Sequence, residues 1–184
     1  MRIRRAIWVV VSATTLVVGL WSGVSAQEAS DHNFVGVEDC AGRCHARDNT
    51  GNQQAAWESS SHSDAYDTLG TPEAQAIADG LGVGNAQEAG ECLVCHTTAY
   101  GIDSSHLGEN FDVTDGVQCE SCHGPGEDYQ NMRIMRDSAE AAANGLITPD
   151  EGVCTGCHNS DSPTFESFDF AAQSAEIAHP IPAE

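Results

Sequence analysis

Four short motifs, each a pair of cysteines followed at once by a histidine, contain all eight cysteines of this 184-residue chain. They are Cys40-Ala-Gly-Arg-Cys44-His45, Cys92-Leu-Val-Cys95-His96, Cys119-Glu-Ser-Cys122-His123 and Cys154-Thr-Gly-Cys157-His158. Two thiols at this spacing can reach the two vinyl groups of one porphyrin, and the adjacent imidazole then lies against the iron. The sequence therefore predicts four haem c groups, attached through the eight cysteines. The proximal iron ligands are predicted to be His45, His96, His123 and His158.

Two other interpretations of the paired cysteines are open at this point. Zinc sites use paired thiols at similar spacing, but they do not need a histidine directly after every second cysteine. A disulfide framework suits an exported chain, yet it leaves the four motif histidines without a role. The first motif has three residues between its cysteines instead of two, so a Cys40–Cys44 disulfide is the alternative there.

The first 26 residues have the pattern of an export signal. Three arginines precede an apolar stretch at 6–20, and a small-residue cleavage site ends at Ala26. The alternative is an uncleaved anchor. We expect residues 1–26 to be a cleaved signal peptide and residues 27–184 to form a single tetrahaem cytochrome c domain. The mature protein would then be periplasmic or extracellular, at the cell surface, with no membrane insertion after signal cleavage.

Acidic residues dominate the charge of the predicted mature chain. It holds 28 aspartates and glutamates against four arginines, and no lysine. Such a surface excludes binding to nucleic acid or to an anionic membrane, because both need positive charge. It would attract a basic docking patch on a redox protein. The alternative is that the carboxylates only solvate the surface.

Large apolar side chains are sparse after residue 26, where Trp57 is the only tryptophan. Such a chain has little from which to build a hydrophobic core, and four porphyrins would supply the missing apolar surface. The gaps between the motifs leave room for short helices but not for a sizeable sheet. We therefore expect a mainly α fold with long ordered loops, a multihaem cytochrome c fold organised around four covalently bound haems.

Several helices are predicted between and after the motifs. Capping and periodicity place them at about 52–69, from Pro72 to an end at Gly80, at 129–144 and at 170–178. Asn85 with Glu88 indicates a capped turn before the second motif. A capping box from Thr148 to Glu151 indicates a helix that leads into the fourth motif.

Four histidines lie outside the motifs, one for each predicted haem: His32, His62, His106 and His179. They would give every iron a second imidazole, and such six-coordinate haems transfer electrons and have no open position for a substrate. His106 is only ten residues past His96, so it can reach a neighbouring ring more easily than its own. For His32 the alternative is a surface histidine, and Met132 and Met135 are alternative ligands.

Several segments together resemble a known family. They are Phe34-Val35-Gly36 ahead of the first motif, Trp57-x-x-Ser60-x-His62, the third motif with its flanks at 116–126, and Ile177-Ala178-His179-Pro180. These residues are similar to those of a multihaem cytochrome c family, of the tetrahaem type that accepts electrons from hydroxylamine oxidoreductase. The resemblance implies a mostly helical fold with haems in close pairs, and distal ligand roles for His62 and His179. It also implies one haem without a distal ligand, which the fourth spare histidine puts in doubt.

The function expected from these features is electron transfer between redox partners by an exported tetrahaem c-type cytochrome that is not an enzyme. One alternative is a subunit of a polymeric extracellular cytochrome filament, formed by self-association, with His32 supplied to an adjoining subunit. Another is a small-molecule (nitrogen oxide) reductase, which requires one five-coordinate haem. We find no other catalytic motif in the chain.

Overall fold

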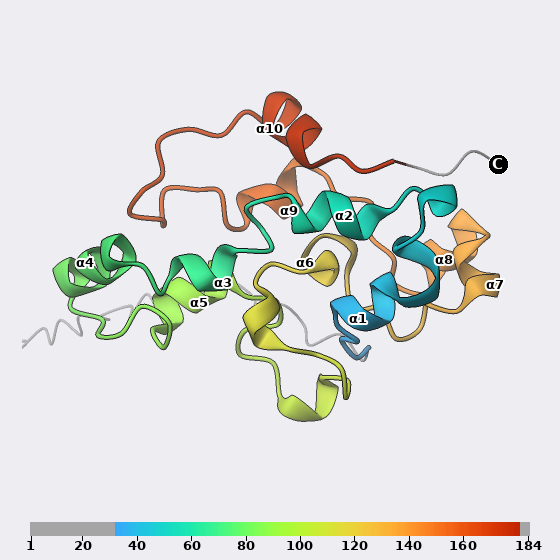
Figure 1. The fold of residues 1–184 in the computed structure, drawn as a ribbon, viewed down its shortest axis with the longest axis horizontal. Coiled ribbons are helices and arrows are strands. Elements are labelled where there is room, and N and C mark those ends of the chain that lie inside the picture. The colour runs from blue at the N-terminus through green and yellow to red at the C-terminus, as the bar shows by residue number, and fades with distance from the viewer. Residues whose placement is uncertain (1–31, 181–184) are drawn as a thin grey trace, which may run out of the picture.

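The computed structural model describes residues 32–180, so the predicted signal peptide lies outside the described residues. Within this range the chain forms short helices joined by long loops, with no strand and one isolated bridge between Phe34 and Leu107. Figure 1 shows an elongated arrangement with α4 near one end and α7 and α8 near the other. In the same range, no helix is long and apolar enough to cross a membrane. The expected mainly α fold is confirmed.

The α-helices are α1 (Val37–Cys40), α2 (Gln53–Glu58), α3 (Ala65–Thr68), α4 (Pro72–Leu81), α5 (Gly90–His96), α6 (Cys119–His123), α7 (Met132–Met135), α8 (Ser138–Ala143), α9 (Glu151–Thr155) and α10 (Phe170–Ile177). One turn of the wider π type is η1 (Ala41–His45). The tighter 3-10 turns are η2 (Asp48–Thr50), η3 (Ser104–His106) and η4 (Val113–Asp115).

The single helix predicted at 52–69 is wrong, because the chain breaks between α2 and α3. The hydroxyl of Ser60 donates to the Trp57 carbonyl, and that of Ser63 donates to the Ser60 carbonyl. Serine side chains that bond to nearby backbone groups compete with helical hydrogen bonds. The break also turns the His62 carbonyl toward another segment, where it accepts the N–H of Val117 at 3.0 Å.

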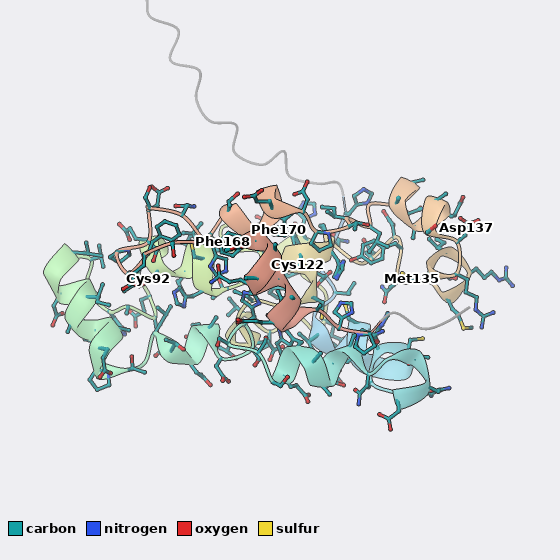
Figure 2. All side chains as sticks on the ribbon, turned by 90° about the horizontal axis from the view of Figure 1, so that it is seen from above. Cys92, Cys122, Met135, Asp137, Phe168 and Phe170 are labelled. Atoms are coloured by element: carbon teal, nitrogen blue, oxygen red, sulfur yellow. The ribbon has the colours of Figure 1, made fainter. Side chains whose placement is uncertain are left out.

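The helix predicted at 129–144 is also wrong, because it divides into α7 and α8. Asp137 caps α8: its side-chain Oδ1 accepts the N–H groups of Ala139 and Glu140, both at 3.1 Å. A residue that caps the second helix has a non-helical backbone, and this ends the first one. Figure 2 shows Met135 and Asp137 together at one end of the molecule.

The other predicted helix ends are close to the observed ones. Helix α4 begins at Pro72 as expected, but it continues through Gly80 to Leu81, and Gly82 with φ +71° is the left-handed residue that ends it. The N-cap of α9 is Asp150, not Thr148. The expected capped turn is present, since the Asn85 side chain donates to Glu88 and accepts the N–H of Gln87.

The side chains of the described residues build only a small apolar core. Leu69, Ala78 and Ala86 form a buried cluster, with Cys92 and Leu93 packed against it. The largest fully buried side chains are Gln118 and Thr98, which are both polar. A chain of this size normally buries many large apolar side chains, so the predicted haems would supply most of the apolar interior.

Candidate haem centres

The first motif fits its extra residue by widening the helical turn. Residues 41–45 form a π-type turn, in which the Ala46 N–H bonds back to the Ala41 carbonyl at 3.0 Å. A π-turn holds one residue more than an α-turn. The cysteines of this motif are four residues apart instead of three, and the wider turn compensates for that difference, so the two thiols and His45 can lie on one side of the turn.

The other three motifs use ordinary helical turns. The second and third motifs end α5 and α6, and in an α-helix residues three and four apart share one face. In the fourth motif the chain continues past α9 as a tight turn, in which the N–H groups of Cys157 and His158 both bond to the Cys154 carbonyl. The backbone of each motif therefore allows its two thiols and its imidazole to share one face.

Contacts between cysteines fix the spatial order of the motifs. The Cys40 thiol lies close to that of Cys119, and this neighbour is the main cause that raises the pKa of Cys40. The Cys95 and Cys157 thiols are also close together, and Cys122 lies near Cys154. The motifs thus follow one another in the order second, fourth, third, first. Figure 2 shows Cys92, of the second motif, toward one end and Cys122, of the third, near the middle.

Hydrogen bonds orient three of the motif imidazoles. In each of them the Nδ1 atom contacts a carbonyl oxygen. The oxygen is in the Gln53 side chain for His45, at 3.0 Å, and in the Ala65 backbone for His96, at 2.7 Å. For His123 it is the backbone oxygen of Ile147, at 3.0 Å. A carbonyl oxygen can only accept, so each Nδ1 carries the proton and each Nε2 keeps a lone pair for a metal. These three imidazoles fit an iron ligand.

Two pairs of imidazoles have the separation that a shared iron requires. The ring centroids of His123 and His179 are 5.8 Å apart, and those of His62 and His158 are 6.0 Å apart. Two imidazoles on opposite sides of one metal, with metal–nitrogen bonds of about 2 Å, place their ring centroids about 6 Å apart. Burial lowers the pKa of His62 and of His123, which favours the neutral imidazole that binds metal.

An aromatic ring supports the fourth-motif histidine. Phe168 stacks on the His158 ring with centroids 4.9 Å apart and planes 16° apart. Phe168 lies in the loop before α10 and is labelled in Figure 2. This stacking restricts the rotation of the imidazole about the bond that joins it to the rest of the side chain. At the other three motifs, hydrogen bonds restrict the same rotation.

Of the remaining two candidate ligands, His32 begins the N-terminal arm, which we define as residues 32–36, and His106 lies beside it. His106 contacts the Asn33 side-chain oxygen through Nδ1 at 3.0 Å, and its carbonyl accepts the Phe34 N–H. His32 contacts the Asp128 carboxylate through Nδ1. In His106, Nε2 is therefore the nitrogen left for a metal.

Glu120, inside the third motif, joins the N-terminal arm to that motif. The side chain is buried, with 3% of its surface exposed. Its carboxylate accepts the N–H groups of Val35 and Gly36, each at 2.8 Å, and that of Gly126 at 2.7 Å. Burial raises the pKa of this carboxyl group, while the three N–H groups act in the opposite direction. Sequence reasoning missed this residue, although the glycines at 36 and 126 were a signal for close backbone approach.

The oriented imidazoles, paired thiols and short helices define a class, the multihaem c-type cytochromes, which bind haem c and transfer electrons. A model of the family described as cytochrome c554 and c-prime matches residues 39–124, which contain the first three motifs. Cytochrome c-554 of Nitrosomonas europaea is 25% identical over 168 residues, an alignment that covers 82% of this chain and 68% of that protein. No solved structure matches the chain. The chain is therefore similar to the cytochromes c554, most clearly over the segment that holds its first three motifs.

Proposed function

We propose that this protein is an exported electron carrier in which electrons pass along four haems in the spatial order of their motifs: second, fourth, third, first. The contacts between cysteines of different motifs support this order, because thioether-bearing sulfurs that touch bring the edges of their haems close together. Short distances between haem edges are what electron transfer needs, and the protein sets them through attachment points and ligands. The partners would be redox proteins.

The ring pairs carry the assignment of ligands. We assign His158 and His62 to the haem of the fourth motif, and His123 and His179 to that of the third. His45 and His96 would be the proximal ligands of the first and second haems. Six-coordinate irons of this kind have no open position, which suits a carrier rather than an enzyme.

His32 and His106 are assigned to the first-motif end of the row. The N-terminal arm beside them is bound to Glu120 of the third motif, and Cys119 of that motif touches Cys40. Since His179 faces the third-motif histidine, the nearest iron still open to a second imidazole is that of the first haem, and it can take one of these two histidines. The bond of His32 to Asp128 of the same chain favours a ligand supplied within the chain over one supplied to a neighbour in a filament.

One observation favours a second candidate function at the second haem. Among the ring contacts of residues 32–180, none places an imidazole opposite His96 or His45, whereas His123 and His158 each have one. The two remaining histidines are assigned to the first-motif end, which leaves the second haem without a second imidazole. If that haem is five-coordinate, it could bind and reduce a small molecule such as a nitrogen oxide. A fully low-spin spectrum of the oxidised protein would exclude this reductase, and a high-spin component that carbon monoxide titrates after reduction would support it.

The proposal also includes export of the protein and docking of its acidic surface to a redox partner. The segment at 1–26 has the features of a signal peptide, and the acidic surface would meet a basic patch on the partner. Both fit a carrier that works in the periplasm or at the cell surface.

The ligand assignment is tested by electron paramagnetic resonance (EPR) of haem-loaded variants. His62→Ala and His179→Ala should each convert one haem from low-spin to high-spin, while all four haems stay attached to their cysteines. Leu81→Ala is the control, since Leu81 is 54% exposed, is no candidate ligand and should leave the spectrum unchanged. Unchanged low-spin spectra in both histidine variants would refute the assignment.

A further inference from the structure

One side chain, that of Gln53, joins two of the proposed haem centres. Its Oε1 accepts the Nδ1–H of His45 at 3.0 Å, and its Nε2 donates to the carbonyl of Pro180 at 2.9 Å. Nε2 also donates to the Thr50 carbonyl at 2.7 Å. His45 is the proposed proximal ligand of the first haem, and Pro180 directly follows His179, the proposed distal ligand of the third.

The backbone before Gln53 has the conformation that this bridge requires. Gly51 has φ +100°, and a Cβ atom there would lie 2.6 Å from the Gln53 Nε2 and 2.7 Å from the Pro180 carbonyl oxygen. Asn52, with φ 45°, continues the left-handed backbone and caps α2 by accepting the Ala55 N–H. Left-handed residues other than glycine are uncommon and strained, so they persist only where surrounding contacts hold them.

A second residue ties the bridge to the first motif. The Thr50 hydroxyl donates to the carbonyls of Cys44 and Arg47. The Gln53 amide is therefore held from three sides: by the motif backbone through Thr50, by the His45 ring, and by the C-terminal segment. Its orientation follows from these partners, with the oxygen toward the imidazole and the nitrogen toward two carbonyls.

We propose that Gln53 is a positioning residue that orients the proximal imidazole of the first haem and holds the distal imidazole of the third against its iron. This inference rests on the ligand roles proposed above for His45 and His179. The acceptor opposite Nδ1 controls how strongly an imidazole donates electrons to its metal. The Gln53 amide nitrogen acts on the third haem centre, because it binds the carbonyl of Pro180, the residue next to His179.

Two substitutions separate the two roles in the haem-loaded protein. Gln53→Leu removes both contacts, so one haem potential should rise, because the imidazole becomes a weaker donor, and a high-spin fraction should appear as His179 detaches in part. Gln53→Glu keeps an acceptor for His45 and makes it stronger, so the same potential should fall. It loses the donor to Pro180, so the high-spin fraction should persist. Opposite shifts in one potential are not expected from a general disturbance of the fold.

Gln54→Leu is the matched control. The Gln54 side chain donates to Glu58 within α2, and its amide takes no part in the bonds to His45 and Pro180, so the potential shift and the high-spin fraction should not appear. Gly51→Ala keeps Gln53 but places a methyl group against its Nε2 and the Pro180 carbonyl. It should therefore produce the high-spin fraction even if Gln53→Leu fails to load haem.

The role of Gln53 and the ligand assignment of His179 would be overturned by different results. Wild-type spectra and potentials in Gln53→Leu, Gln53→Glu and Gly51→Ala, with a high-spin signal in His179→Ala, would overturn the role of Gln53 alone. The absence of a high-spin signal in His179→Ala would instead overturn the ligand assignment on which it rests.

Discussion

Glu120 holds three backbone N–H groups of two separate segments with one buried carboxylate. Both carboxylate oxygens are used, and each of the three partners is a donor. An ionised carboxylate satisfies such a set, whereas a neutral amide would turn an N–H toward a donor. The residue therefore stabilises the packing of the N-terminal arm against the third motif.

We expect Glu120→Gln to lower the free energy of unfolding by about 1–3 kcal/mol, the cost of leaving a buried donor unsatisfied. Glu91→Gln is the control, because Glu91 also adjoins a motif cysteine but is exposed. Denaturant unfolding of both haem-loaded variants, followed by circular dichroism, measures the difference. Equal stabilities would contradict the role assigned to Glu120.

The haem attachment residues could be predicted from the sequence, but the pairs of histidine rings could not. The haem attachment motifs are local, because the thiols and the imidazole that act together lie within six residues, so the cofactor could be predicted and is confirmed. The ring pairs are not local: His62 meets His158, and His123 meets His179, only through the path of the intervening loops. The bridge formed by Gln53 depends on a contact with Pro180 at the far end of the described chain.

At the scale of elements, the helices are shorter than their composition suggests. The alanine-rich run at 129–144 favours one continuous helix, but the capping aspartate within it ends α7 and starts α8. At 59–64 serine hydroxyls do the same between α2 and α3. These residues were visible in the sequence, and their effect depends on whether tertiary contacts favour a break there.

The cap of α8 gives a prediction at this scale. Asp137→Ala should destabilise the protein by about 1 kcal/mol, because two N–H groups of the first turn lose their acceptor. Asp137→Asn keeps an acceptor and should cost less. The measurement is the midpoint of thermal unfolding, with the haem spectrum unchanged in both variants. Equal loss in the two variants would mean that the charge, and not the cap, is responsible.

At the scale of the whole molecule, the haems take the place of a side-chain core. The buried apolar residues of the described range are few and mostly small, such as Ala78, Ala86 and Ala141. Conformational entropy of about 1–2 kcal/mol per residue opposes folding, and this small core cannot offset it. The cofactors and the fold are therefore coupled.

The haem-free chain is consequently expected to be largely unfolded. A variant with all eight motif cysteines replaced by serine should show little helical signal by circular dichroism and an expanded radius in small-angle X-ray scattering. The haem-loaded protein, measured in the same buffer, should be helical and more compact. A compact, helical variant without haem would contradict this account of the core.

The spatial order of the haems is the central claim, and a crystal structure of the haem-loaded protein tests it most directly. The account predicts four haems in the order second, fourth, third, first, with His62 and His158 on one iron and His123 and His179 on the next. Any other order along the row, or an iron between different pairs of these histidines, would contradict it.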